Sequence, residues 1–202
     1  MRNILLTLAL CLAVGAGFLS EIQAHAGVFE LPHFVLPGNF ALGLEPEIIL
    51  TDGAGVGVNA KFTEGLSDLI DGTLLLGTGG GPRQFRFGGN LAFDFFPDIK
   101  GQPGIGLGTQ AIYYRLSSGN GYLEITAIPY VHKTFMSGTD EIEPYFSVPF
   151  GIGLTNGNYN GVATFAVGSM FKNTTSFRYD VEMGIAISNS ESYISGGVTY
   201  YH

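Results

Sequence analysis

The sequence predicts an all-β fold, a closed antiparallel up-and-down transmembrane β-barrel of about ten strands, with eight or twelve strands also possible. Three observations predict it. About ten runs of alternating apolar and polar or small residues follow residue 39 and continue to the C-terminal residues. A segment with the pattern of an export signal precedes them. Only 13% of the residues are charged, whereas soluble domains average about a quarter.

Residues 1–26 are expected to be a cleaved signal peptide. Arg2 gives the positive start, residues 4–19 are almost uniformly apolar, and Ala24-His25-Ala26 offers small residues where signal peptidase cuts. The alternative is a retained membrane anchor. Cys11 lies inside this signal, so the exported chain has no cysteine for a disulfide, a zinc-thiolate site or a thiol nucleophile. Export would use the general secretory pathway.

The remaining chain has no run of 18 apolar residues, so no membrane-spanning helix is predicted. An apolar exported chain without such a helix must still satisfy its backbone polar groups in lipid. A closed barrel does this, because each strand bonds to two neighbours. The net charge of −8 and the lack of a basic patch argue against nucleic acid as a partner.

Residues 27–38 contain two prolines and do not alternate, so they form an expected lead-in at the rim or inside the barrel, before a barrel domain over 39–202. Turn residues such as Asp52-Gly53 and Asn156-Gly157 divide that domain. The predicted strands are 40–50, 54–63, 68–78, 84–96, 104–116, 121–135, 144–154, 160–171, 176–187 and 191–201. The longest links are then 97–103 and 136–143.

The faces of several strands are clear. Phe177, Tyr179 and Val181 alternate with Arg178, Asp180 and Glu182. The third and fifth strands are ambiguous, because apolar residues occupy both parities. Pro46, Pro129 and Pro149 fall inside predicted strands, where we expect bulges, rim positions or strand bounds that differ from the prediction, because proline has no N–H. Aromatic residues near strand ends predict girdles at the headgroup level: Phe40, Phe62, Phe96, Tyr122, Phe135, Tyr145, Phe171, Phe177 and Tyr193.

The residues that alternate with the apolar ones along each strand should line the lumen, where their charged members should form a network. Its acidic members are Glu45, Glu47, Asp71, Asp94, Glu124, Asp180 and Glu182, and its basic members are Lys61, Arg86, Arg178 and His132. A dry interior could not hold this excess of carboxylates charged. Water, a bound cation or protonation would be needed. Two interpretations remain open: a lumen filled by interlocked side chains, and a narrow pore with a weak preference for cations. A ten-stranded barrel is close in size to barrels whose interior is filled by side chains.

Enzyme activity is not expected. Outer-membrane hydrolases need a histidine beside Ser, Asp or Glu near the rim, and His132 has no His-x-Ser partner. Glu124, Tyr130 and His132 share a face, for which a hydrogen-bond network is the preferred interpretation. The acidic residues Asp140, Glu141 and Glu143 suggest a solvated charge run rather than a calcium site. No cofactor or metal is expected.

The alternating segments and the last strand resemble the small outer-membrane β-barrel proteins of Gram-negative bacteria. In that family the C-terminal strand alternates and ends on an aromatic residue that the assembly machinery recognises. Ile194, Val198 and Tyr200 alternate in this way; His202 stands at the end, and Tyr201 could substitute for the terminal aromatic. The resemblance implies residence in the outer membrane, contact with its lipid, and delivery by periplasmic chaperones to the assembly machinery.

The function expected from the sequence is that of a non-enzymatic outer-membrane barrel, either structural or a narrow passive pore for small ions or solutes with a polar, net acidic lumen. The alternative is a soluble periplasmic, lipocalin-like barrel, whose apolar faces would surround a small apolar ligand. Periodicity alone does not distinguish inside from outside.

Overall fold

A computed structural model describes residues 35–202 except 52–53, 81–82, 117 and 173–175, so the predicted signal peptide lies outside the described residues. The strands are β1 (Phe40–Ile49), β2 (Gly55–Ser67), β3 (Ile70–Gly79), β4 (Arg83–Phe96), β5 (Gly104–Leu116), β6 (Gly121–His132), β7 (Phe135–Ser137), β8 (Asp140–Ser147), β9 (Phe150–Thr155), β10 (Asn158–Lys172), β11 (Phe177–Ser188) and β12 (Tyr193–Tyr201). Within these ranges there is no helix long and apolar enough to cross a membrane.

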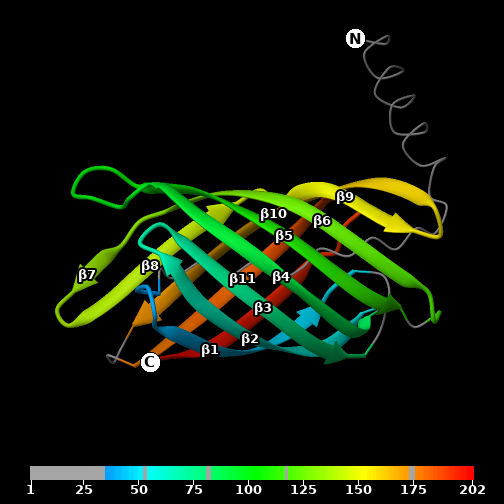
Figure 1. Cartoon of the computed structure of the whole chain (residues 1–202), viewed down its shortest axis with the longest axis horizontal. Helices are drawn as coiled ribbons and strands as arrows, with labels where there is room; N and C mark the ends of the chain where they lie inside the picture. The colour runs from blue at the N-terminus through cyan, green and yellow to red at the C-terminus, as the bar shows by residue number, and fades with distance from the viewer. Residues whose placement is uncertain (1–34, 52–53, 81–82, 117, 173–175) are drawn as a thin grey trace, which may run out of the picture.

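The strands close into an antiparallel ring with ten positions (Figure 1). β1 pairs with β2 on one side and with β12 on the other, which closes the ring. β8 and β9 are two halves of one position, because each pairs with both β6 and β10. β7 pairs with β8 and extends that hairpin beyond the ring. The predicted closed barrel is therefore confirmed.

The main difference from the prediction lies at 136–143. The sequence predicts a link there, and in the structure the segment belongs to the β7–β8 hairpin. The hairpin and the 97–103 link lie at the end of the barrel where β1 begins and β12 ends, which we call the terminal end (Figure 1). We call the opposite rim the far end, where the links between consecutive strands are two to five residues long.

No bulge forms at Pro46 or Pro149, and the predicted strand at Pro149 is wrong in its bounds, because β8 ends at Ser147 and β9 begins at Phe150. On either side of Pro46, β1 and β12 keep one register, with Leu44 opposite Val198 and Glu47 opposite Ser195. Pro149 lies between β8 and β9 and still accepts a hydrogen bond from Thr164 N at 2.9 Å. A proline in a closed ring thus costs one bond and leaves the pairing intact.

The two faces of the ring differ sharply. Large apolar side chains such as Leu74, Phe87 and Ile187 are exposed on the outside, and charged side chains are buried inside. This arrangement suits lipid outside and excludes the lipocalin-like alternative, which requires apolar residues around a central ligand. The ambiguity of the third and fifth strands is also resolved: Leu75 in β3 and Ile112 in β5 point inward among other apolar residues.

The girdle prediction is partly wrong. Phe62, Phe96, Phe135, Phe171 and Phe177 are exposed on the outer face, and Phe40 is half-buried there. Tyr122, Tyr145 and Tyr193 point inward and are buried. Their parity differs from that of the phenylalanines, so position near a strand end is not sufficient to place a ring on the outside.

The end of the lead-in segment lies inside the terminal end of the barrel. Val35 is buried, and its N–H nitrogen lies 3.2 and 3.3 Å from the two carboxylate oxygens of Asp71 in β3. Pro37 forms a parallel bridge with Gly65 in β2. A Cβ at Gly65 would lie 2.0 Å from the Val35 carbonyl oxygen, so only glycine allows the segment to approach this closely.

The 97–103 link is held to the start of the β7–β8 hairpin. The Lys133 ammonium binds the Asp98 carboxylate and the carbonyl oxygens of Ile99 and Gln102, the latter two at 2.7 and 3.0 Å. The N–H of Thr134 donates to Asp98 at 2.6 Å. Burial alone would raise the pKa of Asp98, but the hydrogen bonds from Lys133 and Thr134 outweigh it and lower that pKa below its usual value.

Gly65→Ala should displace residues 35–37 from their contact with β2. The clash should destabilise the barrel by about 1–3 kcal/mol, as overpacking does. Urea unfolding followed by circular dichroism measures this, with Gly161→Ala as the control, because an added Cβ there meets no atom within 4 Å. Equal stability of Gly65→Ala and wild type would show that the contact with Val35 is dispensable.

Asp98→Asn should loosen the 97–103 link. A carboxyl with a lowered folded-state pKa stabilises above its unfolded pKa, and this stabilisation is lost as pH falls through the folded value. We expect a loss of roughly 1–2 kcal/mol near pH 7 that disappears below about pH 3. Thermal unfolding of both proteins between pH 3 and 8 tests this; a difference that stays constant across that range would contradict the assignment.

Candidate functional site: the acidic lumen

The structure places ten of the eleven residues of the predicted charge network in the barrel interior as buried side chains: Glu45, Glu47, Lys61, Asp71, Arg86, Asp94, Glu124, His132, Asp180 and Glu182. Arg178 is half-buried. They come from β1, β2, β3, β4, β6 and β11, so strands from around the ring contribute to the lumen. The neighbouring strands bring several of them together in pairs.

Arg86 of β4 reaches across two strands to Glu47 of β1. It forms an ion pair with the Glu47 carboxylate, whose other oxygen accepts from Asn59 Nδ2 at 3.4 Å. Glycines make room for this reach. A Cβ at Gly57 in β2 would lie 2.6 Å from the guanidinium, and one at Gly77 in β3 would lie 2.8 Å from Arg86 Nε. The long side chain therefore lies flat against the wall and braces it.

A second group surrounds β11. Lys61 Nζ lies 2.5 Å from Glu45, and Glu182 accepts hydrogen bonds from the hydroxyls of Tyr145 at 2.7 Å and Tyr193 at 2.6 Å. The two tyrosines come from β8 and β12, on opposite sides of β10 and β11. Glu182 therefore joins side chains from several strands within the lumen.

Inward tyrosines lie over inward glycines of neighbouring strands. A Cβ would approach the side chain of Tyr122 to 1.7 Å at Gly153, Tyr130 to 2.1 Å at Gly106, Tyr145 to 2.4 Å at Gly168, and Tyr193 to 2.1 Å at Gly184. Each tyrosine thus occupies space that any larger residue would fill. Sequence reasoning missed this feature; its signal was the presence of Tyr and Gly on the polar parity of adjacent strands.

His132 joins two carboxylates at the terminal end of β6. Its Nδ1 lies 2.6 Å from Glu143 Oε1 in β8, and its Nε2 lies 4.0 Å from Asp94 Oδ1 in β4. The prediction that Glu143 belongs to a solvated charge run is wrong, because its side chain is buried. Glu124, eight positions back along β6, lies at another level. No grouping of metal-ligating side chains suitable for an ion occurs in the described part of the chain.

Carboxylates outnumber cations in the lumen. Among the described residues, only Lys61 and Arg86 are buried side chains that are always cationic. Such an excess of acidic groups is costly without water, counter-ions or protonation. The buried acidic residues are Glu45, Glu47, Asp71, Asp94, Glu124, Glu143, Asp180, Glu182 and Glu191.

An apolar layer lies inside the ring beside some of these charges, since Tyr114 is opposite Arg86 and Ile112 is opposite Glu124. It is one buried cluster inside the ring, made of Leu75, Ile112, Tyr114, Leu116, Tyr122 and Val162. β5 ends at Leu116 and β6 begins at Gly121, so the layer lies toward the far end. The lumen is therefore acidic along its length and contains an apolar layer toward the far end.

The C-terminal strand presents its alternating residues as expected. Ile194 and Tyr200 are exposed on the outer face, and Val198 shares their parity. Tyr201 points the other way, with the Arg178 guanidinium 4.6 Å from the centre of its ring. The outer face of β12 thus ends on Tyr200, and Tyr201 takes part in an inner contact.

Arg86→Ala should destabilise the barrel by about 3–5 kcal/mol, because it leaves the buried Glu47 carboxylate without its ion pair. Arg178→Ala is the comparison, with a smaller expected loss of about 0.5–1 kcal/mol, because Arg178 is only half-buried and its guanidinium lies over the Tyr201 ring near the rim. Urea titration of the heat-modifiable gel shift measures both. Equal midpoints for Arg86→Ala and wild type would show that the brace does not stabilise the ring.

Comparison with known proteins supports the fold assignment. No protein-family model and no curated protein sequence matches the chain. Among solved structures, an outer membrane channel from Pseudomonas putida F1 matches with a TM-score of 0.54 at 9% identity, over 87% of this chain and 100% of that one. Designed transmembrane β-barrels match at 0.41, with 14% identity over 82% and 97%. Ail, the attachment invasion locus protein of Yersinia pestis, matches at 0.32, with 10% identity over 81% and 97%.

The likeness to the Pseudomonas channel concerns the fold, since the identity is low. The apolar exterior adds independent support, because so many exposed large apolar side chains would be unfavourable in water and suit contact with lipid. Taken together, the closed ring, its lipid-compatible exterior and its polar interior identify the chain as an integral outer-membrane β-barrel protein.

Proposed function

We propose that the protein is a narrow passage for small cations that is closed in the conformation described. The observation that carries this proposal is the excess of buried carboxylates over buried cations in the lumen. A purely structural interior could be filled by apolar side chains at similar or lower cost, because buried ion pairs rarely stabilise more than well-packed apolar groups do. An acidic lumen attracts cations and repels anions.

The packing restricts what could pass. Tyr114, Tyr122, Tyr130 and Tyr193 are at most 1% exposed, so they fill the cross-section at several levels. The apolar layer at the far end would also resist ions until its side chains move. Only small ions are therefore compatible with this lumen. The Pseudomonas putida protein with a similar ring is an outer membrane channel, and a passage through this lumen would be a related role.

A sealed structural barrel is the second candidate. The tyrosine–glycine contacts favour it, because each one packs a side chain of one strand against the neighbouring strand inside the lumen. We also propose that the outer face of β12, with Ile194, Val198 and Tyr200, is what the assembly machinery recognises, and that periplasmic chaperones deliver the chain to it. Neither candidate requires catalysis, and we propose no enzymatic activity.

Planar-bilayer conductance across a potassium chloride gradient distinguishes the two candidates. We expect a small conductance with a reversal potential that favours potassium. Glu124→Gln should roughly halve that preference by removing one lumen charge. Glu64→Gln is the control, since Glu64 lies on the outer face and should leave selectivity unchanged.

Leu116→Ser tests whether the apolar layer is the barrier. A hydroxyl there should increase conductance by about tenfold if the layer controls the passage of ions, which corresponds to roughly 1.4 kcal/mol of barrier. If neither wild type nor Leu116→Ser conducts ions, the proposed passage is wrong and the sealed structural barrel is the remaining candidate.

A further inference from the structure

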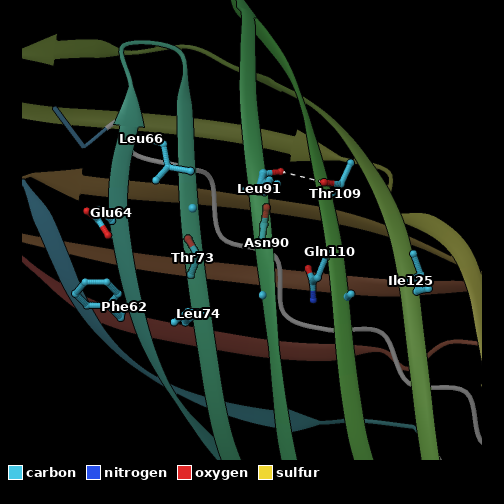
Figure 2. A pocket seen from close by; sticks show the side chains of 13 residues that line it. Phe62, Glu64, Leu66, Thr73, Leu74, Asn90, Leu91, Thr109, Gln110 and Ile125 are labelled. Atoms are coloured by element: carbon cyan, nitrogen blue, oxygen red, sulfur yellow. Dashed lines mark hydrogen bonds between the residues drawn. The ribbon is translucent and has the colours of Figure 1, made fainter. Parts of the chain in front are cut away.

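A groove of about 520 Å³ crosses the outer face of the barrel between β2 and β6 (Figure 2). Its walls are large apolar side chains that are 38–58% exposed: Phe62, Leu66, Leu74, Leu91 and Ile125. Because these residues have the outward parity, the groove opens toward lipid and is separate from the lumen. Glu64 stands beside it and is the one charged residue among the described residues that line it.

Small residues on adjacent strands form the floor. In one row across the sheet, Leu74 lies opposite Gly89, Gly89 opposite Ala111, and Ala111 opposite Ile125. In this row the two central positions are small and the two outer ones are large. In the next row Gly72 lies opposite Glu64 in β2, and the Leu66 side chain packs over it, 3.1 Å from where a Cβ would stand.

Glu64 lies at the depth of the lipid headgroups. It is opposite Phe40 in the register of β1 and β2, and Phe40 stacks on Phe62 with ring centroids 6.0 Å apart. Rings near the ends of barrel strands mark the headgroup level. β2 ends three residues after Glu64, whereas Ile125 lies seven residues from the end of β6. The groove therefore runs from headgroup depth toward the membrane interior.

We propose that this groove binds a phospholipid with a primary-amine headgroup, such as phosphatidylethanolamine. Its acyl chain would lie over Gly89 and Ala111, and its ammonium would lie beside the Glu64 carboxylate. An anionic headgroup would meet repulsion at Glu64. A second copy of the chain is a poorer occupant, because a two-fold contact at this face would bring two Glu64 carboxylates together.

The absence of tryptophan from the whole sequence permits a clean test. Phe62→Trp places a single reporter on the groove wall. Phe171→Trp places one on β10, away from the groove, at a position with the same 38% exposure as Phe62. The folded barrels are placed in phosphatidylcholine vesicles that contain either brominated phosphatidylethanolamine or brominated phosphatidylglycerol, and quenching gives relative association constants.

At Phe62→Trp the amine lipid should associate about two- to fivefold more strongly than the anionic lipid, the range of an exposed ion pair. Adding Glu64→Gln should reduce this ratio to about one, and Gly89→Leu should lower quenching by both lipids at that position. Phe171→Trp should show no preference.

Three results would overturn the proposal. They are equal quenching by the two lipids at Phe62→Trp, a preference that persists in Glu64→Gln, or protection of Phe62→Trp from both lipids, which would indicate that protein covers the groove. The proposal does not depend on ion passage through the lumen, so a silent conductance assay leaves it standing.

Discussion

The structure depends on closure of the hydrogen-bonded ring between β1 and β12. In lipid each unsatisfied N–H or C=O is costly, so every strand needs two neighbours. Closure fixes which parity faces outward, and all other features follow from that choice. Ten positions enclose a narrow interior that side chains must fill. Tyrosines over glycines of neighbouring strands fill it, and the brace from Arg86 in β4 to Glu47 in β1 joins strands that are not neighbours.

Much of the fold could be predicted from the sequence because one face of most strands is uniformly apolar. β11 alternates cleanly and its predicted faces are correct, and the residues of β4 and β6 assigned to the lumen (Arg86, Asp94, Glu124 and His132) are buried inside. β3 and β5 could not be assigned, since Leu75 and Ile112 are apolar residues of the inner layer. The β7–β8 hairpin could not be predicted because β7 lies outside the ring, where no lipid imposes alternation.

The candidate site is less predictable. Parity places the charged residues in the interior, but it carries no information about which of them meet. The contact of His132 with Glu143 depends on how β6 and β8 are paired. The inward tyrosines lie near strand ends as girdle residues do, and only their parity separates them from the outward phenylalanines. The groove beside Glu64 arises where Gly89 and Ala111 lie between Leu74 and Ile125 in a row across four strands, an alignment that only the register reveals.

The central claim is that the apolar face of this ring contacts lipid and the charged face lines its interior. Cell fractionation followed by an alkaline carbonate wash tests it most directly, with gel mobility compared before and after boiling. We expect the protein to remain in the outer-membrane fraction, to require detergent for extraction, and to migrate differently once boiled. A protein released into the soluble periplasmic fraction would contradict the assignment of both faces.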